Sequence, residues 1–136
     1  MTPPTFARRL LPLLVTGLFA GPALAQDWTL KTVNGTPAVG AAVVRFAPDG
    51  AISGSTGCNR FHTKGSFADG TLTLGTGVAM TRMACTNPAV AAQERSFTDL
   101  FQDSVAISFN PLTQELQLKR GDTTLVFLAG SGTPMP

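Results

Sequence analysis

The sequence predicts an α+β domain that is mostly β, with a curled antiparallel sheet or small barrel of about seven or eight strands and one packed helix. Three observations predict this class. Short segments of alternating apolar and polar residues recur along the chain, and turn-forming Gly, Pro and Asp residues separate them. Only one stretch, residues 88–103, has apolar residues at helical spacing. No internal repeat of solenoid length is present. The 111 residues that follow a predicted signal peptide suit one compact domain, so we expect a single domain.

The strand segments are expected in hairpins joined by tight turns. Residues 41–47 and 51–55 flank Pro48-Asp49-Gly50, where proline presets φ at the first corner and glycine tolerates a positive φ. A second Asp-Gly pair at 69–70 repeats the arrangement. The segments predicted to be strands are 28–33, 41–47, 51–55, 65–67, 71–74, 78–85, 105–109, 115–119 and 123–128.

The helix is predicted from its start signal and its apolar stripe. Asn87 is a favourable N-cap, and Pro88 suits the first helical position because its missing N–H is not needed there. We expect the helix to end near Asp103. Together with the strand alternation, this stripe predicts a core made of Trp28, Leu30, Val44, Phe46, Ile52, Leu72, Leu74, Val90, Phe97, Phe101, Ile107, Leu116, Leu118, Val126 and Leu128.

Glu94 lies on or beside the apolar stripe of the helix. An unpaired buried carboxylate is costly, so this side chain needs a partner. The hypothesis at this stage is that Glu94 forms an ion pair with Arg82 or Arg60 and ties the helix to the rest of the domain.

The N-terminal residues have the pattern of a secretory signal peptide. Arg8 and Arg9 precede the apolar run 10–20, and Ala23-Leu-Ala25 is a small-x-small cleavage pattern. Because the apolar run is too short to span a hydrocarbon layer of about 30 Å as a helix, we expect cleavage between Ala25 and Gln26 rather than a membrane anchor. The expected organisation is a signal peptide (1–25), one domain (26–130) and a flexible tail (131–136). The expected location is the periplasm or the exterior.

Removal of the signal peptide would leave 111 of the 136 residues, with Arg8 and Arg9 lost from the ten basic residues and all eight acidic ones retained. The mature chain would then carry equal numbers of basic and acidic residues and no Lys/Arg cluster. This charge pattern gives no reason to expect a nucleic acid or an anionic membrane surface as partner. We expect a monomer.

Two cysteines, Cys58 and Cys85, are present, and an even count in an exported chain indicates a disulfide. Chain-entropy reasoning gives such a bond roughly 3 to 4 kcal/mol of stabilisation. The alternative is a soft-metal site for copper or zinc, because thiolate, thioether and imidazole ligands select such metals. That site would use Cys58, His62, Met80, Met83 and Cys85.

No complete catalytic signature appears. A nucleophilic dyad of Cys58 with His62 would still need an orienting group and an oxyanion site. We therefore expect a protein that is not an enzyme and has no cofactor.

The motifs Gly54-Ser-Thr-Gly-Cys-Asn59 and Thr81-Arg-Met-Ala-Cys85, with Trp28 before them and Glu94-x-x-Phe-x-x-Leu100 after them, resemble the META domain family, including its HslJ-like heat-shock-inducible envelope proteins. The resemblance covers essentially the whole mature chain. It implies a small β-rich domain with a packed helix, exported or envelope-associated, without established enzymatic chemistry. The family motif and structural polar positions are Gly57, Asn59, Arg60, Thr81, Arg82 and Glu94.

The resemblance leads to an expected function: a non-catalytic binding or scaffolding role in envelope stress tolerance. The expected partner is an unidentified envelope protein or small ligand. Two alternatives stay open, a periplasmic copper-binding protein and a binder of small apolar ligands or peptides. A real apolar cavity beside the helix would favour the last of these.

Overall fold

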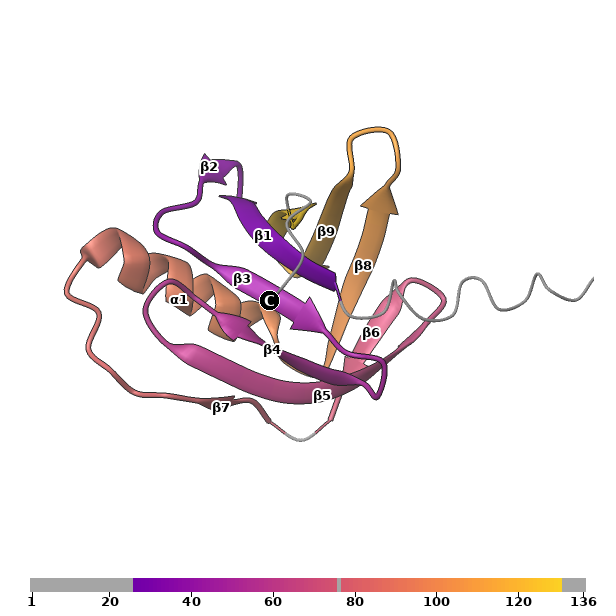
Figure 1. Ribbon diagram of the computed structural model, residues 1–136, viewed down its shortest axis with the longest axis horizontal. Helices are drawn as coiled ribbons and strands as arrows, with labels where there is room; N and C mark the ends of the chain where they lie inside the picture. Colours follow the sequence, from indigo (N-terminus) through magenta and orange to yellow (C-terminus); the bar gives the residue numbers. More distant parts are fainter. Residues whose placement is uncertain (1–25, 76, 131–136) are drawn as a thin grey trace, which may run out of the picture.

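The computed structural model describes residues 26–75 and 77–130, which form a closed antiparallel barrel with one helix (Figure 1). Eight strands follow one another around the barrel in the order β10-β9-β8-β6-β5-β4-β3-β1, and β10 pairs with β1 to close it. This architecture confirms the predicted fold class. The eight strands are β1 Gln26–Val33, β3 Val43–Phe46, β4 Ala51–Ser55, β5 Arg60–Ala68, β6 Thr71–Leu74, β8 Ser104–Asn110, β9 Glu115–Arg120 and β10 Thr123–Ala129. Two short strands add to it, β2 Thr36–Pro37 on β1 and β7 Ala79–Met80 on β5.

The helix of the described part of the chain, α1 (Pro88–Leu100), begins where the sequence predicts. The Asn87 side chain accepts hydrogen bonds from the N–H groups of Ala89 and Val90, which satisfies donors that have no partner within the helix. The helix ends at Leu100, three residues before the predicted end at Asp103. By Asp103 the chain has already turned toward β8, and the Asp103 carbonyl accepts the N–H of Leu74 on β6.

The helix covers one end of the barrel. This closed end carries the β2–β3 loop, the β4–β5 turn and the β9–β10 turn. Gln93 of α1 donates hydrogen bonds to the β2–β3 loop and to the β4–β5 turn. The side chain of Arg120, the last residue of β9, donates to the carbonyl of Asp99 on α1. Below the helix, four aromatic rings come into contact and all four are buried: Phe61, Phe97, Phe101 and Phe127.

The opposite end of the barrel is open. The β3–β4, β5–β6 and β8–β9 turns lie there, as does the first residue of β1, which pairs with the last residue of β3. In Figure 1 this end faces away from α1. Four aromatic side chains stand at this open end in two edge-to-face pairs, Trp28 with Phe109 and Phe46 with Phe67.

The register of β10 corrects the predicted core. The sequence pattern assigned Val126 and Leu128 to the interior, but the structure buries Leu125 and Phe127 instead. A shift of one residue moves every side chain of a strand to the other face. All five residues from Thr124 to Leu128 suit a strand, so only pairing with β9 and β1 selects the inward set.

Other differences concern the boundaries of strands. Residues 78–85 were predicted as one strand, yet only Ala79 and Met80 pair with β5. Residues 65–67 belong to a longer strand, β5, that begins at Arg60. No helix among the described residues is long and apolar enough to cross a membrane. The predicted signal peptide (1–25) and tail (131–136) lie outside the described residues.

Candidate functional site

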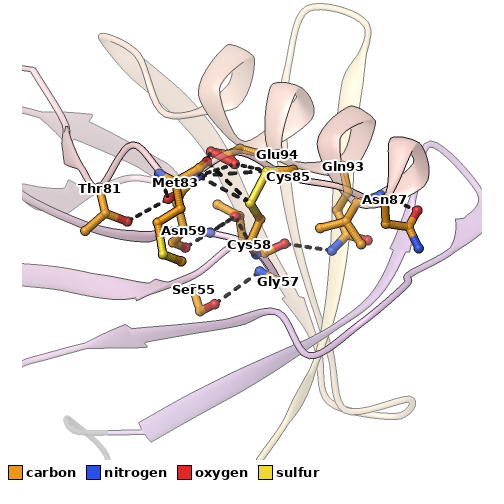
Figure 2. The surroundings of a disulfide bond; sticks show 12 residues. Ser55, Gly57, Cys58, Asn59, Thr81, Met83, Cys85, Asn87, Gln93 and Glu94 are labelled. Carbon is orange, nitrogen blue, oxygen red and sulfur yellow. Dashed lines mark hydrogen bonds between the residues drawn. A yellow bond between two sulfur atoms is a disulfide. The ribbon is translucent and has the colours of Figure 1, made fainter.

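The β4–β5 turn, residues 56–59, places a cysteine and an asparagine beneath the helix. The Thr56 hydroxyl accepts from the N–H groups of Cys58 and Asn59, and Thr56 itself is fully buried. This local bonding holds the turn without a regular ladder. The turn therefore presents Cys58 and Asn59 toward α1 and the segment that precedes it (Figure 2).

The two glycines of the turn motif, Gly54 and Gly57, are each required for a different steric reason. A Cβ on Gly54 would lie 1.9 Å from the carbonyl oxygen of Val43, so any side chain would collide with the neighbouring strand. Gly57 has φ +101°, a region that side chains disfavour, and a Cβ there would approach the Gln93 amide at 3.2 Å. Both positions therefore need glycine for the barrel wall and the turn to come together.

Cys58 and Cys85 form a disulfide, with their Cα atoms 5.7 Å apart. The bond joins the β4–β5 turn to the segment just before α1, across 27 positions of sequence. It fastens the start of the helix to the closed end of the barrel.

Asn59 is the centre of the polar network around the disulfide (Figure 2). The Asn59 Oδ1 accepts from the N–H of Met83 at 2.7 Å and from the Thr81 hydroxyl at 2.9 Å. The Asn59 Nδ2 donates to the carbonyl of Met83 at 3.0 Å. One amide side chain thus bonds both backbone groups of Met83, as a neighbouring strand would, and continues the β5–β7 pairing beyond its last residue.

Glu94 of α1 completes this network, and its partner differs from the one expected. Both carboxylate oxygens accept from Asn59 Nδ2, at 2.9 and 2.8 Å. The Cys85 Sγ lies 3.1 Å from Glu94 Oε1. Neither Arg60 nor Arg82 pairs with Glu94 among the described residues. The arginine hypothesis was wrong because the turn brings an amide, rather than a guanidinium, under the carboxylate.

The two arginines have other positions in the structure. Arg60 is exposed, and its backbone contributes instead, since its N–H donates to the Thr81 hydroxyl and its carbonyl accepts the N–H of Thr81. Arg82 is also exposed and lies along the cleft described below.

Gln93 plays a second bridging role that sequence reasoning missed. It is 4% exposed, and its amide bonds both the N–H and the carbonyl of Val39, at 2.9 Å each, and also donates to the Thr56 carbonyl at 2.8 Å. The signal was present: Gln93 lies four residues before Phe97, on the buried stripe of the helix. A polar residue on that stripe needs partners from the barrel.

The structure does not assemble the soft-metal site. Atoms of Cys58, Cys85 and Glu94 lie within 4.8 Å of one another, but both sulfurs are joined in the disulfide and are not thiolates. His62 is exposed and follows the buried Phe61 on β5, so it faces the outside of the barrel wall. A Cys58–His62 dyad is not formed either, because Cys58 is in the disulfide and His62 faces the outside of the barrel.

A cleft of about 740 Å³ lies between α1 and the segment 77–85. Its apolar lining includes Phe61, Leu74, Val78, Met80, Met83, Phe97 and Phe101. Arg82, Arg95 and Gln102 line it as well, and all three are exposed. Asn59, Cys85 and Glu94 form part of the wall, so the polar network supports one side of the cleft.

Comparison with known proteins places this geometry in a family. The META domain model matches residues 22–131. Heat shock protein HslJ of Escherichia coli (strain K12) is 30% identical over 128 residues, which cover 86% of this chain and 89% of that protein.

Two solved structures are similar to this chain in fold. An NMR structure at 29% sequence identity has a TM-score of 0.66 and covers 78% of this chain and 91% of its own. A second NMR structure, of a protein from Burkholderia xenovorans, has a TM-score of 0.58 at 24% identity, with coverage of 79% and 83%. The second likeness concerns the fold alone.

Proposed function

The chain belongs to the META domain family, and on that premise we propose that it is an exported, non-catalytic binding protein of the cell envelope whose binding surface is the cleft beside α1. The similarity to a heat shock protein supports a role in stress tolerance. The ligand in this proposal is a small apolar molecule or an apolar peptide segment.

Export is supported by two features that lie far apart in the chain. The first 25 residues have the pattern of a cleavable signal peptide. The Cys58–Cys85 disulfide is a bond that persists in oxidising compartments and is rare in the cytosol. The two features are consistent with one location, the periplasm or the exterior.

The single observation that carries the binding proposal is the cleft itself. Its volume of about 740 Å³ lies within the range of roughly 300 to 1,000 Å³ that small-molecule sites occupy. Apolar side chains from the barrel, from the segment before α1 and from α1 contribute the larger part of its lining. Polar and charged side chains line the rest, among them Arg82, Arg95 and Asp103. Met83, 63% exposed, presents an adaptable apolar side chain to a ligand there.

A role without catalysis is supported by what the reactive side chains already do. Both cysteines are in the disulfide, and the Glu94 carboxylate is engaged by Asn59. The histidine, His62, is exposed on the barrel wall and does not line the cleft. The groups that line the cleft are suited to holding an apolar ligand in place.

The test is to fill the cleft from the helix and measure binding of an apolar fluorescent probe, N-phenyl-1-naphthylamine. Ala91 lines the cleft, whereas its neighbour Ala92 is exposed and does not. Ala91→Phe should weaken probe binding at least about tenfold, because the ring occupies the space that the probe needs. The matched control Ala92→Phe adds the same ring outside the cleft and should leave the affinity unchanged. Equal affinities for both variants and the parent protein would overturn the proposal.

A further inference from the structure

The cleft beside α1 has an apolar floor that continues into the core of the barrel. Four of its lining residues belong to the buried core cluster, and each of them is at most 9% exposed: Phe61, Leu74, Phe97 and Phe101. Their side chains carry no hydrogen-bonding group. A peptide backbone laid on these side chains would lose its water partners without gaining others, whereas a hydrocarbon chain has none to lose. The floor therefore favours a hydrocarbon chain.

The cleft reaches this floor because the barrel wall is thin beside the first half of β5. The second half of β5 pairs with β6, from Gly65 to Ala68. The first half has on that side the two-residue strand β7, which pairs at Phe61 and His62. Within the described part of the chain, β7 pairs with no strand other than β5. The space between β7 and α1 is therefore left to the cleft, which both elements line.

Two arginines line the cleft, one on each of its walls. Arg82 belongs to the segment between β7 and α1, and Arg95 belongs to α1 itself. Both residues are exposed, so their charged groups lie in solvent above the buried floor. Neither forms an ion pair with another residue of 26–75 or 77–130. We call them the cleft arginines.

The acidic side chains that line the cleft already have partners. Both carboxylate oxygens of Glu94 accept from Asn59 Nδ2, at 2.9 and 2.8 Å (Figure 2). The Asp103 carboxylate lies 3.6 Å from the Arg120 guanidinium. The cleft arginines are therefore the charged groups available to a ligand. A guanidinium presents its N–H groups in a planar fork that matches a carboxylate.

We propose that the cleft binds a fatty acid, with the hydrocarbon chain on the apolar floor and the carboxylate at Arg82 and Arg95. This inference rests on the proposed function and narrows its ligand to a single-chain amphiphile with one anionic head. The buried floor supplies most of the affinity through the hydrophobic effect. The cleft arginines supply selectivity for the head group, because exposed ion pairs contribute modestly to affinity.

Decanoate and decanol test the role of the cleft arginines, because the two ligands share a chain length and differ in the head group. Their affinities can be measured by displacement of N-phenyl-1-naphthylamine. Arg82→Gln with Arg95→Gln should lower the affinity for decanoate about tenfold more than the affinity for decanol. Equal changes for the two ligands would overturn the proposal.

The matched control is Arg60→Gln with Lys119→Gln, which removes the same two charges outside the cleft. Both residues are exposed, and neither lines the cleft. This variant should keep the preference of the parent protein for decanoate. An equal loss of preference in the control would show that net charge, rather than the cleft arginines, selects the ligand, and would overturn the proposal. All four positions are exposed, so both double variants should keep the melting temperature of the parent protein.

The neutral probe separates this inference from the proposed function. N-phenyl-1-naphthylamine carries no charge, so its binding reports on the apolar floor. Ala91→Phe should weaken decanoate and decanol alike, because the ring fills the space of the hydrocarbon chain. Probe binding in the cleft without any dependence of decanoate on the arginines would overturn the fatty-acid inference and leave the proposed function standing. Absence of probe, decanol and decanoate binding would overturn both.

A lipid surface is the other source of anionic head groups, and vesicles of phosphatidylglycerol test it. Sedimentation with these vesicles that requires both cleft arginines, in a protein that does not bind free decanoate, would identify a membrane surface as the occupant and overturn the fatty acid. Salt gives a further check. At about 1 M salt the screening length falls to about 3 Å, so the preference for decanoate over decanol should shrink. A preference that is insensitive to salt would contradict an ionic contact with the head group.

Discussion

The two ends of the barrel differ in how far they bury phenylalanine side chains. At the closed end Phe97 is 1% exposed and Phe127 is fully buried, whereas at the open end Phe67 and Phe109 are 54% and 46% exposed. Phe67 and Phe109 extend the inward-facing rows of β5 and β8, as Phe127 does in β10. The difference shows that inward alternation does not by itself bury a ring near the end of a barrel. A covering element is needed, and α1 covers only one end.

The closed end also differs in how irregular backbone is held. Asn59 bonds both backbone groups of Met83, and Gln93 bonds both backbone groups of Val39. Each amide side chain makes the two backbone hydrogen bonds that a neighbouring strand would make to a residue in an irregular segment. Buried backbone groups need such partners, so the helix can cover this end only because these two side chains satisfy the loops around it.

The largest expected effect contrasts one phenylalanine from each end. Phe97→Ala should lower the free energy of unfolding by about 3 to 5 kcal/mol, because it leaves a cavity among three other rings. Phe67→Ala should cost less than about 1 kcal/mol, since half of the side chain is already in contact with solvent. Urea denaturation of both variants measures the contrast. Similar losses would show that the open end is as tightly packed in solution as the closed one.

The disulfide gives the next largest effect, and it belongs to the closed end alone. Replacing Cys58 and Cys85 together by serine should lower stability by roughly 3 to 4 kcal/mol, because the unfolded chain regains the entropy of a 27-position loop. Thermal unfolding with and without dithiothreitol measures the effect. The parent protein should lose the same stability on reduction, and the double variant should not respond to the reductant. A loss below about 1 kcal/mol would mean that the Asn59 network alone holds the segment before α1.

The smallest of these effects tests the polar centre of the closed end. Asn59→Asp removes the donor that Met83 and Glu94 share and places a second carboxylate beside Glu94, so it should cost about 2 kcal/mol. The matched control is Asn87→Asp, the same substitution at the N-cap, where a carboxylate still accepts the helix N–H groups and favours the helix dipole. Melting temperatures of both variants decide the matter. An equal change in melting temperature for the two variants would show that the hydrogen bonds of Asn59 do not stabilise the closed end as argued here.

Local features of the fold were predictable because their causes lie within a few residues. The N-cap at Asn87 and the hairpin turn at Pro48-Asp49-Gly50 are examples, since capping and turn geometry depend on neighbouring side chains and dihedral preferences. The cysteine pairing also follows from the count of two. The face of β10 did not follow, because Leu125 to Leu128 carry apolar side chains on both faces.

The partner of Glu94 shows the same limit at the site. Its place beside the apolar stripe indicated a need for a partner, but the partner is Asn59, 35 positions earlier in the chain. Gln93 was missed for a related reason, because its bonds go to Val39 and Thr56, which approach the helix only when the barrel is closed.

Periodicity, capping and turn chemistry act over short distances, so the fold class, the helix start, the turns and the pair of cysteines available for a disulfide could all be predicted from the sequence. The folded structure was needed to show which end of the barrel the helix covers, which face of β10 is buried, and which side chain meets Glu94. Those outcomes depend on the closure of β10 onto β1 and on contacts between residues far apart in the chain, which no local pattern encodes.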